Sequence, residues 1–222
     1  MIPLLHDFEG QTVLVFGGGS VGARKARRFA REAHVVVVSP TFAGSDDEAG
    51  AERFGGADLI RASPDPAAVG DWFDRTTPAL AVAATDSEAM NERVETVARE
   101  RGVLVNRTDQ HGHRDPGSVV VPATVRDDPV VAAVATGGTS PALSRYLRQR
   151  IEAEIADAGA MADLTGNLRE QLQAEGVDQD RRRAAIRAVV RSEKVWKALD
   201  SGATNAQQVA ADVISDVTGE TS

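Results

Sequence analysis

The sequence has no cysteine among its 222 residues, which excludes disulfide bonds, thiolate metal sites and a cysteine nucleophile. Aromatic residues make up only 4% of the chain, so its core must be built from Val, Ala, Leu and Ile, as is typical between helices and a parallel sheet. Long apolar runs are also missing, because stretches such as 119–125 and 130–135 have only strand length. No basic region followed by an apolar one opens the chain. We therefore expect a soluble cytoplasmic protein without a membrane span.

Lysine is nearly absent as well. Only three of the 25 Lys and Arg residues are lysine, and 33 Asp and Glu residues outweigh them to give a formal net charge of -8. The isoelectric point is about 5.1. General attraction to nucleic acid is therefore not expected, because that attraction needs excess positive charge.

Strand-like segments recur along the first half of the chain, with helical stretches between them. The strand-like segments are residues 12–16, 34–38, 58–60, 79–83 and 103–106, and helical periodicity marks 21–32 and 88–101. A spacing of about 20 to 25 residues is typical of repeated βαβ units. The sequence therefore predicts the α/β class, with a Rossmann-like parallel sheet in a dinucleotide-binding domain over residues 1–112.

The pattern changes after that domain. Two strand-like runs, "SVVVPATV" from residue 118 and "PVVAAVA" from residue 129, are separated by a polar turn and predict an antiparallel strand pair. Helices are expected at 140–156, within 160–174, and at 180–191, 192–199 and 205–217. We predict a strand-pair segment over 113–155, for dimerisation and the substrate pocket, and a helical annex over 156–222.

The stretch "GGGSVG" follows the first strand and opens a helix. Gly17, Gly19 and Gly22 satisfy the dinucleotide-binding pattern G-x-G-x-x-G, in which glycines allow a tight turn, close approach of a pyrophosphate and close helix packing. The N–H groups at the helix start, including those of Ser20 and Val21, favour phosphate. A glycine-rich packing turn without a ligand is the alternative.

The end of the second strand lacks the acidic residue that often binds the ribose of NAD. Ser39, Pro40 and Thr41 occupy that position. NAD could still bind through hydroxyl and backbone groups, and the sequence does not decide between NAD and NADP. Nearby, four arginines (Arg24, Arg27, Arg28 and Arg31) form a stripe on the first helix, which is either a solvated face or a surface that attracts a polyanion.

Four stretches together carry a family resemblance: "GGGSVGARKA", "AVAATDSEAMNERV" at 81–94, "VLVNRTD" at 103–109 and "VVAAVATGGTSPALSRYLRQRIE" at 130–152. Over about residues 4–155 the chain resembles the precorrin-2 dehydrogenases, the dehydrogenase/ferrochelatase module of siroheme synthases. The resemblance implies NAD-dependent oxidation of precorrin-2 to sirohydrochlorin, in some members followed by insertion of Fe(II). It also implies a homodimer. The methyltransferase module of the fused enzymes is missing, so a separate methyltransferase would supply precorrin-2.

The resemblance also implies roles for single residues. Residues 17–22 match the phosphate turn of the family, 39–41 its adenosine-ribose edge, and Thr85 and Asp86 a turn that faces the cofactor. Asn106 is assigned to the cofactor site, and Asp109 matches the carboxylate that is regarded as catalytic.

The chemistry of Asp109 can be argued separately. Dehydrogenation sends a hydride to the nicotinamide and releases a proton that a carboxylate at a strand end could accept. Metal insertion also displaces pyrrole protons, and an oxygen ligand could deliver Fe(II). One base could thus serve both reactions. The alternative is a loop aspartate that bonds its own backbone.

In "TGGTSP", Ser140 is expected to cap a helix that has Pro141 at its first position. Such a helix start can hold an anion, so Gly137, Gly138, Thr139, Ser140 and Arg145 are candidates for binding the substrate carboxylates. Simple helix capping is the alternative.

Two departures from the family pattern stand out. The loop after Asp109 is longer than usual and contains His111 and His113, which either contact a metal or are merely solvated. Arg107 and Thr108 replace the usual apolar pair before the aspartate.

A different class of function also fits the sequence. The chain could be a regulatory module that senses NAD(H) without chemistry and uses its helical tail as the output element. A tetrapyrrole enzyme that performs only one of the two reactions is a further alternative.

Overall fold

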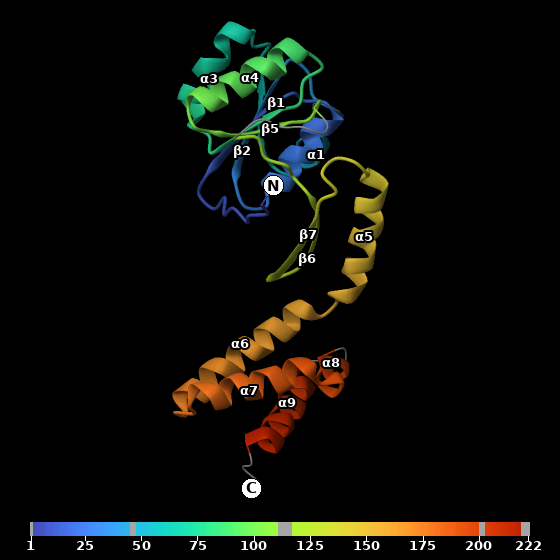
Figure 1. Cartoon of the computed structure of the whole chain (residues 1–222). Coiled ribbons are helices and arrows are strands. Elements are labelled where there is room, and N and C mark those ends of the chain that lie inside the picture. Colours follow the sequence, from blue (N-terminus) through green and yellow to red (C-terminus); the bar gives the residue numbers. More distant parts are fainter. Residues whose placement is uncertain (1, 45–47, 111–116, 200–202, 219–222) are drawn as a thin grey trace. The chain divides into compact units, whose positions relative to one another are not determined.

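The computed structural model describes residues 2–44, 48–110, 117–199 and 203–218. The chain divides into two compact units, residues 1–121 and 122–222, which are considered separately below. Figure 1 labels their helices and strands. The predicted three-part division at residues 112 and 155 stays a prediction.

The first unit is built on five parallel strands in the order β3-β2-β1-β4-β5. They are β1 (Thr12–Phe16), β2 (His34–Ser39), β3 (Asp58–Arg61), β4 (Leu80–Ala83) and β5 (Leu104–Arg107). The helical elements between them are α1 (Ser20–Phe29), α2 (Glu48–Arg53), the 3-10 turn η1 (Pro66–Ala68), α3 (Val69–Thr76) and α4 (Glu88–Glu100). The predicted Rossmann-like parallel sheet is confirmed.

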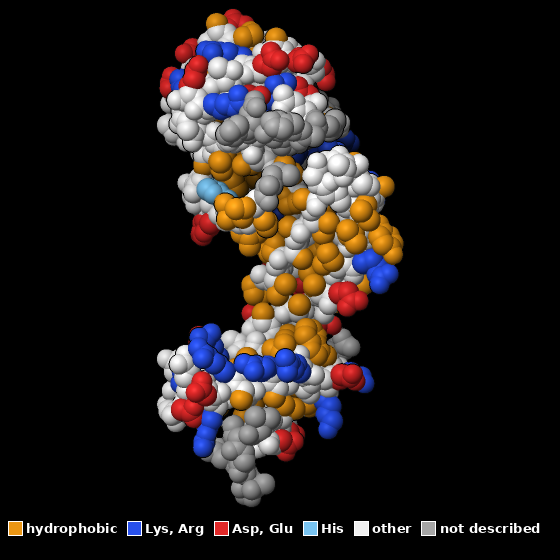
Figure 2. Space-filling model, in the orientation of Figure 1, with side chains coloured by type: hydrophobic (Ala, Val, Ile, Leu, Met, Phe, Trp, Pro, Cys, Tyr) orange, Lys and Arg blue, Asp and Glu red, His pale blue; other side chains and the backbone are white. Residues whose placement is uncertain are grey.

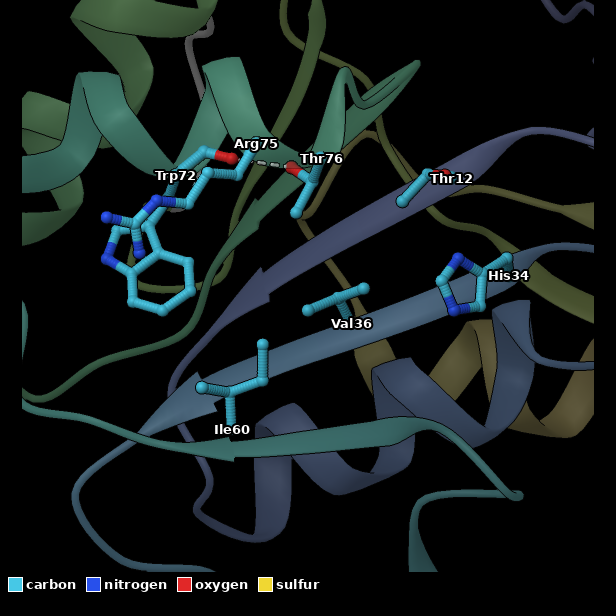
Figure 3. A pocket seen from close by; sticks show the side chains of 7 residues that line it. All are labelled: Thr12, His34, Val36, Ile60, Trp72, Arg75 and Thr76. Atoms are coloured by element: carbon cyan, nitrogen blue, oxygen red, sulfur yellow. Dashed lines mark hydrogen bonds between the residues drawn. The ribbon is translucent and has the colours of Figure 1, made fainter.

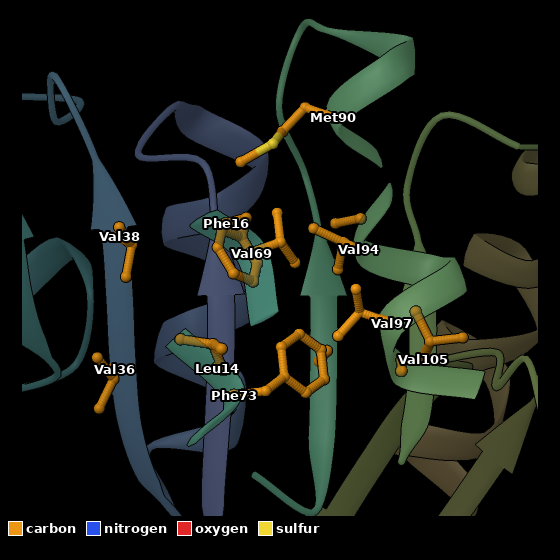
Figure 4. Packing of buried hydrophobic residues seen from close by; sticks show 13 residues of the cluster. Leu14, Phe16, Val36, Val38, Val69, Phe73, Met90, Val94, Val97 and Val105 are labelled. Carbon is orange, nitrogen blue, oxygen red and sulfur yellow. The ribbon is translucent and has the colours of Figure 1, made fainter. Parts of the chain in front are cut away.

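Both faces of this sheet are covered by helices. Alternate side chains of β1, such as Leu14 and Phe16, pack with α3 and α4, and Figure 4 shows Phe73, Val94 and Val97 in that cluster. The intervening side chains, such as Val13 and Val15, pack against α1 and the segment around α2 on the other face. Burial on both faces explains why these strands form continuous apolar runs in the sequence.

One predicted strand is placed wrongly. The run from residue 118 does not enter the antiparallel pair as a whole: Ser118 bridges Val105 of β5 in parallel, and the Val119 N–H donates to the Val105 carbonyl over 2.8 Å. The pair itself begins only at Ala123. Pro122 separates the two parts, because proline has no N–H for a ladder and restricts the residue before it.

The described residues of the second unit form that pair and five helices. The pair consists of β6 (Ala123–Asp127) and β7 (Val130–Val134), which are antiparallel, as predicted. The helices are α5 (Pro141–Glu154), α6 (Ala158–Ala174), α7 (Gln179–Arg191), α8 (Glu193–Leu199) and α9 (Ala203–Thr218). Their positions confirm the predicted helical tail. Among the described residues, no helix combines the length and apolar character needed to cross a membrane.

The apolar residues of the second unit are buried unevenly. Helices α6 to α9 share a core that includes Met161, Leu164, Val189 and Val195. In contrast, α5 has no buried residue, and Val125 alone is buried in the hairpin. The hairpin and α5 thus form a layer with little core of its own.

Candidate functional site

The glycine turn lies between β1 and α1, at the carboxyl edge of the sheet. Gly17 has a φ of +113°, and a Cβ there would overlap the carbonyl oxygen of Ala84. A Cβ on Gly22 would overlap the carbonyl oxygen of Gly17, so this glycine lets α1 pack against the turn. A Cβ on Gly19 would meet nothing within 4 Å. The space before Gly19 is therefore open to a ligand.

The first turn of helix α1 presents backbone N–H groups without an acceptor in the helix to that space. Gly19 is its N-cap, and the first bond within the helix runs from the Ala23 N–H to the Gly19 carbonyl over 2.9 Å. The N–H groups of Ser20, Val21 and Gly22 precede that bond and have no acceptor within the helix. Such groups, together with the helix dipole, suit the pyrophosphate of a dinucleotide.

The end of β2 forms the neighbouring wall of this turn. Ser39 is buried, whereas Pro40 and Thr41 are exposed. The Ala43 N–H donates to the Gly18 carbonyl over 2.7 Å, and Arg61 donates to the Pro40 carbonyl over 3.0 Å. Of the three predicted ribose contacts, Ser39 is thus turned into the protein, and Pro40 and Thr41 remain accessible.

The turn after β4 is held by a buried asparagine. Asn91, 1% exposed, accepts from the Thr85 N–H and hydroxyl and donates to the Thr85 carbonyl over 2.9 Å. The Thr85 hydroxyl also donates to the Ser87 carbonyl. Thr85 therefore shapes the turn with its own hydrogen bonds, and Asp86 beside it is exposed.

Asp109 follows β5 directly and is paired with an arginine. Arg107 Nε donates to Asp109 Oδ1 over 3.0 Å, and Arg107 Nη2 donates to Asp109 Oδ2 over 2.6 Å. The third nitrogen, Nη1, lies 3.1 Å from Oε2 of Glu95 on α4. Glu95 Oε1 in turn accepts from Arg99 over 2.6 Å and from the Ser118 hydroxyl over 3.4 Å. The result is a chain of alternating charges, Arg99–Glu95–Arg107–Asp109.

The members of this chain differ in exposure. The side chains of Arg107 and Glu95 are 3% and 7% exposed, whereas that of Asp109 is 29% exposed. The hydrogen bonds from Arg107, above all, lower the pKa of Asp109 against the effect of burial, and the Asn91 amide acts in the same direction. The bonds to Asp109 likewise raise the pKa of Arg107. Asp109 is therefore an ionised carboxylate with one side open to solvent.

Asn106, one residue before Arg107, has an unsatisfied acceptor. Its amide nitrogen donates to the Val119 carbonyl over 2.7 Å, but its Oδ1 atom is buried and has no partner among the described residues. Asn106 lines a hollow of about 210 Å³ together with Val21, Arg24 and Thr108. A buried acceptor without a donor is costly, so this atom is suited to a donor group of a ligand. This hollow adjoins the start of α1 and the end of β5.

A larger hollow of about 530 Å³ lies elsewhere in the first unit (Figure 3). Its lining includes Thr12 and His34 at the starts of β1 and β2, Ile60, and Trp72 and Arg75 of α3. None of the predicted site residues that the structure describes belongs to its lining. Because ligands of open α/β sheets bind at the carboxyl ends of the strands, the smaller hollow is the better candidate.

The predicted substrate residues lie in the second unit. Ser140 caps α5 by accepting from the Leu143 N–H over 3.3 Å, and Pro141 occupies the first turn, which confirms the predicted cap. Gly137 and Gly138 have φ values of +64° and +83°. Thr139 closes the loop by donating to the Thr136 carbonyl over 2.6 Å, and Arg145 is exposed. Their binding of substrate stays a prediction.

The prediction that Asp109, His111 and His113 contact a metal ion stays a prediction. The described residues contain no group of three or more His, Cys, Asp or Glu side chains that could hold a metal ion. His111 and His113 lie outside the described residues.

Sequence reasoning missed three residues of the site. Gly18 was included in the phosphate turn but given no role of its own, although a Cβ there would overlap the Thr41 carbonyl oxygen. Asn91 and Glu95 were not recognised as buried, although both interrupt the apolar side of α4 with polar groups, 1% and 5% exposed. Polar residues on the buried side of a helix were the available signal.

Comparison with known proteins gives consistent matches. The family model described as "Putative NAD(P)-binding" matches residues 4–123. A precorrin-2 dehydrogenase of Methanosarcina barkeri is 31% identical over 220 residues, which cover 96% of this chain and 93% of that protein. The siroheme synthase of Azotobacter vinelandii is 36% identical over 210 residues, which cover 94% of this chain. Those residues cover 43% of that synthase, so the chain spans less than half of its length.

A solved structure shares the fold. The chain described as "SirC, precorrin-2 dehydrogenase" aligns with a TM-score of 0.70 at 21% sequence identity, covering 97% of this chain and 100% of that chain. At this identity the likeness shows the arrangement of helices and strands.

Proposed function

Because this chain belongs to the precorrin-2 dehydrogenase family, we propose that it oxidises precorrin-2 to sirohydrochlorin in siroheme biosynthesis, with NAD as the hydride acceptor. The observation that carries this proposal is the end-to-end match to a precorrin-2 dehydrogenase of nearly the same length. The glycine turn and the carboxylate after β5 supply the two features that the reaction needs from the protein.

The glycine turn is the proposed dinucleotide site. Gly17, Gly18 and Gly22 keep the backbone compact, and the open space before Gly19 leaves room for the pyrophosphate at the start of α1. NAD, when bound, takes up the hydride. Pro40 and Thr41 offer backbone and hydroxyl groups at the adenosine-ribose end, where a carboxylate is usual, so discrimination against NADP should be weak.

Asp109 is the proposed proton acceptor. Loss of a hydride raises the charge of the macrocycle by one unit. The remaining protons of this cation are acidic, so a weak base is sufficient to remove one of them. Arg107 keeps the Asp109 carboxylate ionised and ready to accept a proton. Because its side chain is 29% exposed, Asp109 can pass that proton on to water.

Asn106 is a proposed orienting group. Its unpartnered Oδ1 can accept a hydrogen bond from a donor, such as a pyrrole N–H of the substrate or the carboxamide of the cofactor. Binding of either donor would remove an unfavourable buried acceptor.

The start of α5 is the proposed anchor for the substrate carboxylates. The backbone N–H groups of Gly137 and Gly138 precede the Ser140 cap, and Arg145 adds positive charge one turn later. The Thr139 N–H already donates to the Thr136 carbonyl over 3.1 Å. Precorrin-2 carries several acetate and propionate groups, so contacts of this kind would suit it.

A homodimer is proposed through the hairpin and α5. Figure 2 shows hydrophobic side chains along α5, where Leu143 is 46% and Tyr146 is 55% exposed. An apolar layer with so little core of its own is suited to a second surface of the same kind.

The direct test is an anaerobic incubation of the protein with precorrin-2 and NAD or NADP. We expect NADH to form together with the absorption spectrum of sirohydrochlorin, at a rate proportional to protein concentration. Failure to form NADH with a protein that still binds NAD would contradict the proposal and favour the sensor alternative.

A further inference from the structure

Both oxygen atoms of the Asp109 carboxylate are already engaged by Arg107. The two contacts, of 3.0 and 2.6 Å, form a forked pair in which two parallel N–H groups face the two oxygens.

Arg107 cannot readily leave this arrangement. Its side chain is 3% exposed, and Nη1 is held from behind by Glu95, whose side chain is 7% exposed. Glu95 is in turn held by Arg99 and Ser118. Moving the guanidinium away from Asp109 would break a partly buried ion pair at one end while Glu95 continued to hold it at the other.

A divalent cation on Asp109 would meet that guanidinium. A metal bound to a carboxylate oxygen lies only about 2 Å from it, which would bring its charge close to a guanidinium that is 3% exposed.

We propose that Arg107 is a specificity-determining residue that keeps divalent metal ions off Asp109, so that this chain oxidises precorrin-2 but does not insert Fe(II). The part that concerns precorrin-2 rests on the proposed function, whereas the exclusion of metal from Asp109 does not. Insertion replaces two pyrrole protons of sirohydrochlorin by one Fe(II) ion. A separate metal-inserting reaction must therefore consume the product of this chain.

The test supplies sirohydrochlorin directly, so that the oxidation step is not needed. Anaerobic absorbance spectra follow insertion of Co²⁺ or Fe²⁺ with wild type, with Glu95→Gln/Arg107→Met, and without protein. The double variant removes the inner ion pair as a unit and leaves Asp109 free. We expect wild type to insert metal no faster than the protein-free solution and the double variant to be at least tenfold faster.

Three controls make each outcome informative. Adding Asp109→Asn to the double variant should abolish the gain, which ties it to this carboxylate. Thermal unfolding and NAD affinity report whether the double variant is folded, and Arg107→Gln offers a milder second variant. The absence of NADH from precorrin-2 with wild type would show that the proposed function itself has failed.

Two results would overturn the inference. One is insertion by wild type that exceeds the protein-free rate and is lost in Asp109→Asn. The other is a folded double variant and a folded Arg107→Gln variant that both insert metal no faster than wild type.

Discussion

The sheet of the first unit and the hairpin layer of the second are made of similar residues but are buried to different extents. In β1, β2 and β4 almost every side chain is buried, because helices of the same unit cover both faces. In β6, β7 and α5 only Val125 is buried. Valine-rich strands can therefore either complete a core or form part of an apolar surface.

This difference in burial suits the sheet and the hairpin layer to different roles. The sheet rigidly positions the glycine turn, Asn106 and Asp109, which suits groups that must be held precisely for chemistry. The hairpin and α5 expose apolar side chains and the capped helix start, which suits contact with another surface. The predictions below test this division, in order of decreasing effect.

The largest effect is expected from Asp109→Asn. Turnover of precorrin-2 should fall by roughly 10²- to 10⁴-fold, the usual contribution of a positioned general base. NAD affinity should stay unchanged, because the glycine turn is intact. Anaerobic NADH formation and calorimetric titration with NAD measure the two quantities. An unimpaired rate would show that Asp109 is not the base of the reaction and would favour a regulatory role.

The second effect concerns the compact glycine turn. In Gly18→Ala the added Cβ would overlap the Thr41 carbonyl oxygen and lie 2.8 Å from Ser39 Cβ, so unfolding free energy should fall by about 3 kcal/mol. In the matched variant Gly19→Ser the added Cβ meets no atom within 4 Å and serine is a good N-cap, so stability should change by less than about 0.5 kcal/mol. Chemical denaturation measures both.

The same pair of variants separates packing from binding. Gly19→Ser should still weaken NAD binding about tenfold, or roughly 1.4 kcal/mol, because its side chain occupies the space left for the pyrophosphate. Equal NAD affinities of Gly19→Ser and wild type would argue against binding at this turn.

The third effect tests the exposed layer. Leu143→Glu with Tyr146→Glu places two charges on the apolar side chains of α5 and should convert a dimer to a monomer in sedimentation experiments. The first unit should keep its NAD affinity, because its core is self-contained. Gln207→Glu, at an exposed position of α9, is the control that adds charge without removing apolar surface. A double variant that remains dimeric would show that the dimer interface does not depend on these side chains of α5.

The smallest effect is expected at the start of α5. Ser140→Ala removes the hydroxyl that accepts from the Leu143 N–H and should cost about 1 kcal/mol of unfolding free energy in the second unit. Ser140→Asp keeps an acceptor there and should retain most of the stability. Thermal unfolding compares the two, and equal losses would show that the cap contributes little.

Most of the sheet was predictable because its signals are local. The strands at 12–16 and 34–39 are short, valine-rich apolar runs, and the glycine turn between β1 and α1 has a recognisable spacing. The run from 118 to 125 was harder. Most of its residues favour a strand, and only the pairing of Ser118 with Val105 and the break at Pro122 divide it between two partners.

The site was predictable only in part, for a similar reason. Asp109 and Asn106 could be assigned from the segment that carries them, but their surroundings could not. Glu95, on α4, meets Arg107 of β5 because the βαβ connection brings them together. A single sequence gives no direct sign of such a contact.

The sequence by itself determined the order of strands and helices, the glycine turn and the position of a carboxylate just after β5. Those features depend on apolar periodicity and on residues adjacent in the chain. Only the tertiary structure decided that Arg107 and Glu95 are buried, that Asp109 is held by a forked pair, and that Asn106 keeps a free acceptor. The strength of a charge or hydrogen bond depends on distance and on exclusion of water, and both are set by packing between segments far apart in the chain.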